Sequence, residues 1–170
     1  MDLNLAGKKA LITGASKGIG LAIAKRFAME GCSVVLVARS EDDLKQAQRD
    51  ILTTDQSVGV DYRVADLSKT NEVSTLAKEQ ADIDILVNNA GAIPAGNINR
   101  VDEVTWREAW DLKLFGYISL CREIYASMSA RRDEPGQRAV SYTHQTLPTN
   151  REVLISVVAV SLKKKGGGGG

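Results

Sequence analysis

The chain has 170 residues, 44% of them hydrophobic and 25% charged, and its formal net charge at pH 7 is +1. This length suits one domain, and the composition is that of an ordinary globular protein rather than a disordered one. The weak net charge argues against a nucleic-acid partner, and no apolar run reaches the roughly 20 residues that a membrane-spanning helix needs. The N-terminus lacks the apolar stretch of a signal peptide, so we expect no membrane partner and a cytoplasmic location.

The histidine and cysteine content limits the chemistry further. His144 is the only histidine, which argues against a His-rich metal site and against a Ser-His-Asp triad. Cys32 and Cys121 are the only cysteines and lie far apart in the sequence, as is typical of small buried side chains in a reduced compartment. We therefore expect neither a metal site nor a disulfide.

Apolar runs and helical periodicities alternate through the first 130 residues. Each predicted strand is followed by a predicted helix, which is typical of right-handed βαβ units and a parallel sheet. If the glycine-rich turn after the first strand lies where the strand order reverses, that order is 3-2-1-4. The sequence therefore predicts an α/β fold with a doubly wound parallel sheet. The predicted strands are residues 9–13, 33–38, 58–65 and 83–88, and the predicted helices are residues 19–29, 41–52, 69–80 and 102–130.

The segment 102–130 carries the longest helical pattern, with apolar side chains at steps of three or four residues. Such a stripe is typical of a helix face buried in the core or in a subunit interface, and a ligand-binding role is the lesser alternative. The stripe consists of Trp106, Trp110, Leu114, Ile118, Cys121, Tyr125 and Met128.

Three glycines follow the first predicted strand and open the first predicted helix. Gly14 permits a tight turn, Gly18 lets the backbone approach a pyrophosphate, and Gly20 lets the helix pack against the strand. The free N–H groups at the helix N-terminus favour an anion. A glycine triplet alone is weak evidence, but its place between a strand and a helix is the context that dinucleotide binding requires. The predicted cofactor-binding residues of this turn are Gly14, Ser16, Lys17, Gly18, Ile19 and Gly20.

The end of the second strand bears on the choice between the two nicotinamide cofactors. NAD-preferring sites usually have an acidic residue there for the ribose 2′-hydroxyl, whereas this chain has Ala38, Arg39 and Ser40. The Arg39 guanidinium can bind a 2′-phosphate through two hydrogen bonds, and Lys17 adds a second positive charge. NADP(H) is therefore favoured over NAD(H), with Arg39 and Ser40 as predicted ligands. The alternative is that both cations are solvated surface charges.

Further candidate residues follow the third and fourth predicted strands. Asp66 and Leu67 end the third strand, where the Asp66 carboxylate can accept a hydrogen bond from an adenine amino group. Asn88, Ala90 and Gly91 belong to an Asn-Asn-Ala-Gly run after the fourth strand, whose amides can bind the neighbouring strand and a ribose. Ligands of parallel sheets bind at the carboxyl ends of the strands, so all of these are predicted cofactor-binding residues. Each taken alone is more often a turn residue.

Together these pieces resemble the short-chain dehydrogenase/reductase family over residues 5–130. The matching runs are residues 13–20, 66–68 and 88–91, in the order and spacing of that family. The resemblance implies a Rossmann fold, an NAD(P) cofactor and hydride transfer between the nicotinamide and an alcohol or carbonyl substrate. It also implies a homo-oligomer, in which the helix at 102–130 commonly forms an interface.

The resemblance also tells us which residues normally carry the chemistry: Asn, Ser, Tyr and Lys, the last two spaced Tyr-x-x-x-Lys. Lys113 stands at the position of the Asn. Tyr142 is followed by Thr146 where the Lys is expected, and Ser141 directly precedes Tyr142 instead of lying well upstream. We therefore predict an NADP-dependent oxidoreductase of this family whose Ser, Tyr and Lys are absent from this chain, so that the chain itself is inactive. The alternative is a dinucleotide-binding or regulatory protein without hydride transfer.

The end of the chain differs in character from the rest. Residues 140–149 resemble the conceptual translation of a transposase-type sequencing adapter, with Gln145 as the single difference. Residues 155–162 resemble the translation of a flow-cell primer in the same way. A natural low-complexity terminus is the alternative.

These observations predict a Rossmann domain at residues 1–138, truncated near Arg138 and without its C-terminal strands, followed by a non-native tail at 139–170. Truncation would leave the fourth strand as an apolar edge with unpaired backbone groups. We therefore expect a strand near residues 154–160 to pair with residues 83–88.

Overall fold

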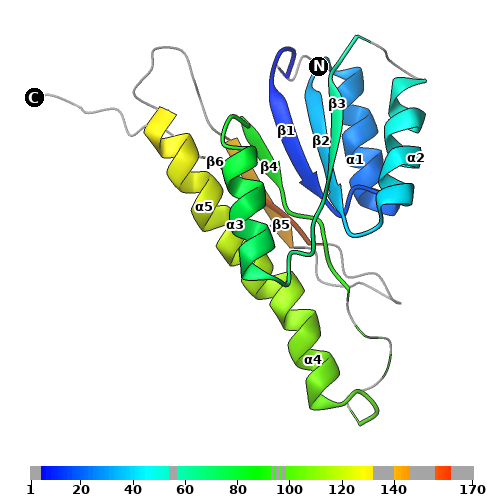
Figure 1. Ribbon diagram of the computed structural model, residues 1–170, viewed down its shortest axis with the longest axis vertical. Coiled ribbons are helices and arrows are strands. Elements are labelled where there is room, and N and C mark those ends of the chain that lie inside the picture. Colours follow the sequence, from blue (N-terminus) through cyan, green and yellow to red (C-terminus); the bar gives the residue numbers. More distant parts are fainter. Residues whose placement is uncertain are drawn as a thin grey trace, which may run out of the picture.

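The computed structural model describes residues 5–53, 57–92, 94, 96 and 99–131, and only the backbone of residues 140–145 and 156–161. Its centre is a six-stranded sheet with the strand order β3-β2-β1-β4-β5-β6 (Figure 1). The first four strands run parallel in the order 3-2-1-4, which confirms the predicted fold. They are β1 (Lys9–Thr13), β2 (Ser33–Ala38), β3 (Val60–Val64) and β4 (Ile85–Val87).

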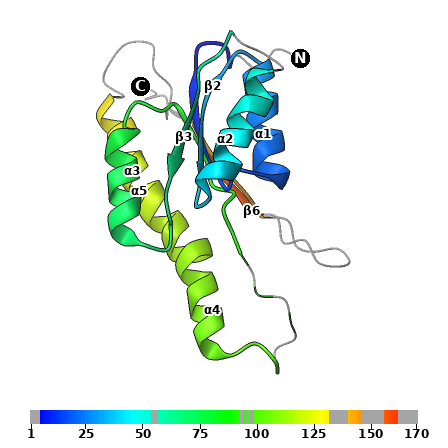
Figure 2. The ribbon, with the colours of Figure 1, turned by 45° about the vertical axis from the view of Figure 1, so that its right-hand side comes forward.

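The two central strands are almost wholly apolar because both faces of the sheet are covered. Successive side chains of β1 point to opposite faces, so Ile12 and Leu11 belong to two separate cores. Ile12 lies in the core beneath α1 (Gly18–Met29) and α2 (Glu41–Leu52), and Leu11 in the core beneath α3 and α5. The helices α3 (Thr70–Glu79) and α5 (Tyr117–Ala130) thus form the second layer of a doubly wound sheet (Figures 1 and 2).

The segment predicted as one helix at 102–130 contains three helical pieces. It begins where expected, because the Asp102 carboxylate accepts a hydrogen bond of 2.8 Å from Thr105 N and caps α4 (Glu103–Trp110). A π-helical turn, η1 (Asp111–Gly116), then separates α4 from α5. The prediction of an uninterrupted α-helix was therefore wrong. Within the described part of the chain, none of the helices has both the length and the apolar character needed to cross a membrane.

Most of the predicted apolar stripe of this segment does not face the core. Of its members, Met128 is buried and Trp106 and Cys121 are half-buried, whereas the other four are exposed. The helix is apolar on two neighbouring faces, and periodicity cannot decide which of them meets the sheet. The exposed members are Trp110, Leu114, Ile118 and Tyr125, and the residues buried in their place are Tyr117, Leu120 and Ile124.

The expected strand near residues 154–160 forms, but its neighbour was predicted wrongly. β5 (Val140–Gln145) pairs in parallel with β4, with Val140 opposite Ile85. β6 (Ser156–Ser161) then pairs antiparallel with β5 and does not lie directly beside β4. The open edge of β4 is therefore occupied by β5, which precedes β6 in the sequence, and β6 forms the outer edge of the sheet.

Candidate nucleotide-binding site

The structure requires glycine at Gly14, in the turn between β1 and α1, and at Gly20, in the first turn of α1. Gly14 has φ +65°, and a Cβ there would lie 2.9 Å from Ala90 Cα. At Gly20 a Cβ would collide with the carbonyl group of Gly14 and would lie 2.6 Å from Asn89 Nδ2. The first turn of α1 therefore lies directly against the loop after β1.

A small hydrogen-bond network joins this turn to the end of β4. The buried Thr13 hydroxyl donates to Val87 O at 3.3 Å and accepts from Asn89 N at 2.9 Å and from Ala90 N at 3.0 Å. The Asn89 amide donates from Nδ2 to Thr13 O at 3.1 Å and to Gly14 O at 3.2 Å. The carboxyl ends of the two central strands are thus held together by side chains as well as by the strand ladder.

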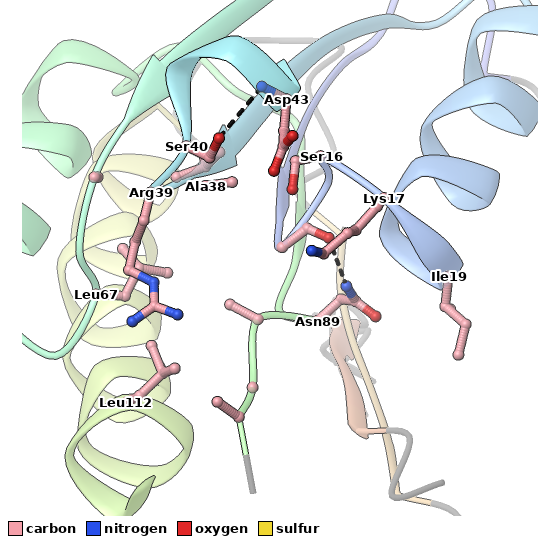
Figure 3. A pocket seen from close by; sticks show the side chains of 16 residues that line it. Ser16, Lys17, Ile19, Ala38, Arg39, Ser40, Asp43, Leu67, Asn89 and Leu112 are labelled. Atoms are coloured by element: carbon pink, nitrogen blue, oxygen red, sulfur yellow. Dashed lines mark hydrogen bonds between the residues drawn. The ribbon is translucent and has the colours of Figure 1, made fainter. Parts of the chain in front are cut away.

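A pocket of about 440 Å³ lies above these strand ends, where the strand order reverses (Figure 3). Nine of the predicted cofactor-binding residues line it, which are Gly14, Ser16, Lys17, Ile19, Arg39, Ser40, Leu67, Ala90 and Gly91. The other lining residues were not predicted as ligands, and these are Val37, Ala38, Asp43, Ala65, Asn89, Ala92 and Leu112. Four predicted residues do not line it, namely Gly18, Gly20, Asp66 and Asn88.

The two asparagines after β4 point to opposite sides of the chain and have different surroundings. Asn89 lines the pocket, whereas Asn88 is fully buried and donates from Nδ2 to the half-buried Cys121 Sγ at 3.1 Å. Asn88 Oδ1 has no hydrogen-bond partner among the described residues. Since successive residues of an extended chain point to opposite sides, only one of the two asparagines can line the pocket, and the fold determines that it is Asn89.

The Asp66 carboxylate stabilises the turn after β3 by hydrogen bonds within that turn. Its Oδ1 accepts hydrogen bonds from Ser68 N at 3.1 Å and from Ser68 Oγ at 2.7 Å. Burial opposes ionisation of Asp66, but the bonds from Ser68 and the charges of Lys69 and Arg39 hold its pKa below the ordinary value. The carboxylate is therefore ionised at neutral pH and stiffens the loop that carries Leu67 into the pocket.

Two cations extend into the pocket from opposite sides, Arg39 beside Leu67 and Leu112, and Lys17 toward Asn89 (Figure 3). Neither forms an ion pair within the described part of the chain. The Ser40 hydroxyl accepts from Asp43 N at 3.3 Å and caps α2, which directs the chain sharply away after Arg39. The pocket therefore offers unpaired positive charge at the end of β2 and at the N-terminus of α1.

The π-helical turn contacts the segment after β4. Lys113 lies against Gly91, and the Tyr117 hydroxyl donates a hydrogen bond to Ala90 O. Burial lowers the pKa of the Lys113 ammonium. The other positions compared with the family's catalytic residues lie in the tail: Ser141 and Tyr142 belong to β5, of which only the backbone is described, and Thr146 lies outside the described residues.

Comparison with known proteins agrees with this geometry. The family model described as short chain dehydrogenase matches residues 8–137. A dehydrogenase/reductase SDR family protein 7-like of Anopheles gambiae is 36% identical over 138 residues, covering 76% of this chain and 43% of the relative. The 3-oxoacyl-[acyl-carrier-protein] reductase FabG of Chlamydia muridarum is 32% identical over 136 residues, covering 78% of this chain and 54% of the relative.

Among solved structures, L-sorbose reductase from Gluconobacter frateurii, complexed with NADPH and L-sorbose, matches with a TM-score of 0.71 and 37% identity. The match covers 77% of this chain and 51% of that chain. The chain spans about half the length of the curated relatives it matches. The glycine turn, the paired strand ends and the pocket above them occur within the matched region, and the chain belongs to the short-chain dehydrogenase/reductase family.

Proposed function

We propose that the protein is an NADP-dependent oxidoreductase that acts on an alcohol or carbonyl substrate. The observation that carries the cofactor assignment is the end of β2, where Ala38 offers no carboxylate and Arg39 is unpaired among the described residues and faces the pocket. The solved relative that matches with a TM-score of 0.71 is complexed with NADPH. A bound nicotinamide dinucleotide would supply the hydride donor or acceptor, which no side chain can provide.

Different residues of the pocket would bind the pyrophosphate, the 2′-phosphate and the adenine of the dinucleotide. The first N–H groups of α1 have no side-chain cap at Lys17, so they are open to a pyrophosphate. Gly14 and Gly20 place no side chain at their own positions, which lets the backbone there approach the anion. Arg39 would bind the 2′-phosphate, and the apolar side chains of Leu67 and Leu112 would flank the adenine. Asn89 keeps the strand ends in register beneath the ligand.

Arg39→Ala is expected to weaken NADPH binding about tenfold and to leave NADH binding unchanged, because only NADPH carries the 2′-phosphate. Isothermal titration with both cofactors measures this difference. Lys45→Ala is the matched control, since Lys45 is a half-buried lysine on α2 that is paired with Glu41 and does not line the pocket. Equal losses for NADPH and NADH in Arg39→Ala would overturn the assignment to NADP(H).

A second candidate function is dinucleotide binding without hydride transfer. Lys113 favours it, because the family resemblance expects an Asn there. NADPH oxidation measured with a panel of carbonyl substrates separates the two candidates, since binding without turnover supports the second.

For the 170-residue chain we propose that turnover is absent and that residues 139–170 are not native. Sequencing an independent clone past codon 138 tests this: a Tyr-x-x-x-Lys run supports it, and the present tail found intact refutes it.

We further propose that the protein forms a homo-oligomer through the exposed apolar face that runs from the end of α4 along η1 and α5. Trp110 at the end of α4, Phe115 in η1, and Ile118 and Tyr125 in α5 are each about half exposed. Ile118→Asp is expected to convert the oligomer to a monomer, because it puts a charge at the centre of this face. Sedimentation velocity measures the change, with Thr75→Asp on the exposed side of α3 as the control. A monomeric wild-type chain would contradict the proposal.

A further inference from the structure

Lys113 lies behind the wall of the pocket that Gly91 forms. It follows Leu112, which lines the pocket, within the π-helical turn η1. A Cβ built on Gly91 would stand 3.7 Å from Lys113 Cδ, 3.9 Å from Cγ and 4.0 Å from Cε, so the aliphatic stem runs along this glycine. π-helical turns are rare and occur frequently at functional sites. The turn thus brings a lysine against the same segment that forms the end of the pocket.

The charge of Lys113 has no counter-charge within the described part of the chain. Its side chain is half-buried, and it forms neither an ion pair nor a hydrogen bond with any described residue. A partly desolvated ammonium without a partner is unfavourable for folding, so its presence calls for a role beyond packing. Five other lysines have a carboxylate within 4.0 Å, and these are Lys8, Lys9, Lys25, Lys45 and Lys69. The described lysines that share the lack of a carboxylate, Lys17 and Lys78, are exposed.

The position of Lys113 relative to a dinucleotide follows from the proposed function, on which this inference rests. A dinucleotide binds across the crevice with one nucleoside on each side of the point where the strand order reverses. Because Arg39 would bind the 2′-phosphate, the adenosine half lies at the end of β2. The pyrophosphate lies at the N-terminus of α1, in the middle of the pocket. The nicotinamide half then lies over the end of β4, where Ala90, Gly91 and Ala92 line the pocket.

We propose that Lys113 makes this site prefer the reduced cofactor over the oxidised one. The oxidised nicotinamide ring carries one positive charge, and the reduced ring, which holds one hydride more, is neutral. An ammonium whose stem runs along Gly91 repels the positively charged oxidised ring and leaves the neutral ring unaffected. The site would then retain NADPH and release NADP⁺, which favours the direction in which a carbonyl compound is reduced.

The experiment compares the dissociation constants of NADP⁺ and NADPH for each variant by isothermal titration at pH 7. Lys113→Met removes the charge and keeps an unbranched stem against Gly91. It is expected to lower the ratio of the NADP⁺ dissociation constant to the NADPH dissociation constant about tenfold. Lys113→Arg keeps the charge and should keep the ratio. Lys78→Met is the matched control, because Lys78 is exposed on α3 and its loss changes the net charge equally.

An unchanged ratio in Lys113→Met, or an equal change in Lys78→Met, would overturn the proposal. Thermal unfolding of each variant establishes that it is folded, and Lys113→Gln provides a second neutral side chain with the same expected ratio if Lys113→Met does not fold. A wild-type chain that binds neither nucleotide contradicts the proposed function itself. A chain that binds both with a ratio independent of Lys113 contradicts only the role of this lysine, so the two failures are distinguishable.

Discussion

Gly20→Ala is expected to abolish the NADPH binding that we propose, raising the dissociation constant more than about a hundredfold. The new Cβ would collide with the carbonyl group of Gly14, which is backbone and cannot rotate away, and would lie 2.6 Å from Asn89 Nδ2. Helix α1 must then move away from the turn that holds the pyrophosphate. We expect the free energy of unfolding to fall by about 1–3 kcal/mol as well, as for other overpacked sites.

Titration with NADPH and urea unfolding measure the two effects of Gly20→Ala separately. Gly59→Ala is the control, because a Cβ at Gly59 would meet only the Ser33 side chain, at 3.2 Å from Oγ, and Gly59 does not line the pocket. It should bind NADPH as tightly as the wild-type chain. If Gly20→Ala also binds NADPH with wild-type affinity, the α1 N-terminus is not the pyrophosphate site.

Thr13→Val is expected to lower the free energy of unfolding by about 2–3 kcal/mol. Valine has nearly the shape of threonine, so the change removes a hydroxyl and leaves the packing almost intact. The N–H groups of Asn89 and Ala90 would lose their acceptor, and Thr13 is fully buried, so water cannot replace it there. Urea unfolding measures the loss.

The matched control for this change is Thr75→Val. The Thr75 hydroxyl is exposed on α3 and donates only to Asn71 O, one turn earlier, so its removal should change stability by less than about 0.5 kcal/mol. Equal stability of Thr13→Val and Thr75→Val would show that the Thr13 hydroxyl does not hold the strand ends together. A drop confined to Thr13→Val supports the network that joins β1 to β4.

The parallel sheet and the glycine turn could be predicted because their signals are local. The apolar runs of β1 and β2 and the spacing of Gly14, Gly18 and Gly20 each lie within one element and its flanking turn. The family resemblance rested on such local signals, since each of its matching runs (residues 13–20, 66–68 and 88–91) is a short continuous segment. For the same reason most residues predicted on the turn after β1 and at the end of β2 line the pocket.

The errors arose where the outcome depends on contacts between distant segments. Asn88 and Asn89 are adjacent and chemically identical, and only the direction of the chain after β4 turns Asn89 to the pocket and Asn88 to Cys121. The π-helical turn also has no periodic signal of its own. Leu112 was missed as a pocket residue because the fold, and not its neighbours in sequence, brings it beside Arg39.

The bonds from Thr13 and Asn89 imply that the floor of the pocket is preorganised. The Thr13 hydroxyl and the Asn89 amide nitrogen are both hydrogen-bonded within the protein, to Val87 O, to backbone N–H groups and to the carbonyls of Thr13 and Gly14. A ligand therefore meets strand ends whose conformation is already set, and binding need not order them. The entropic cost of binding should fall instead on long exposed side chains at the rim, of which Arg39 and Lys17 are the principal ones.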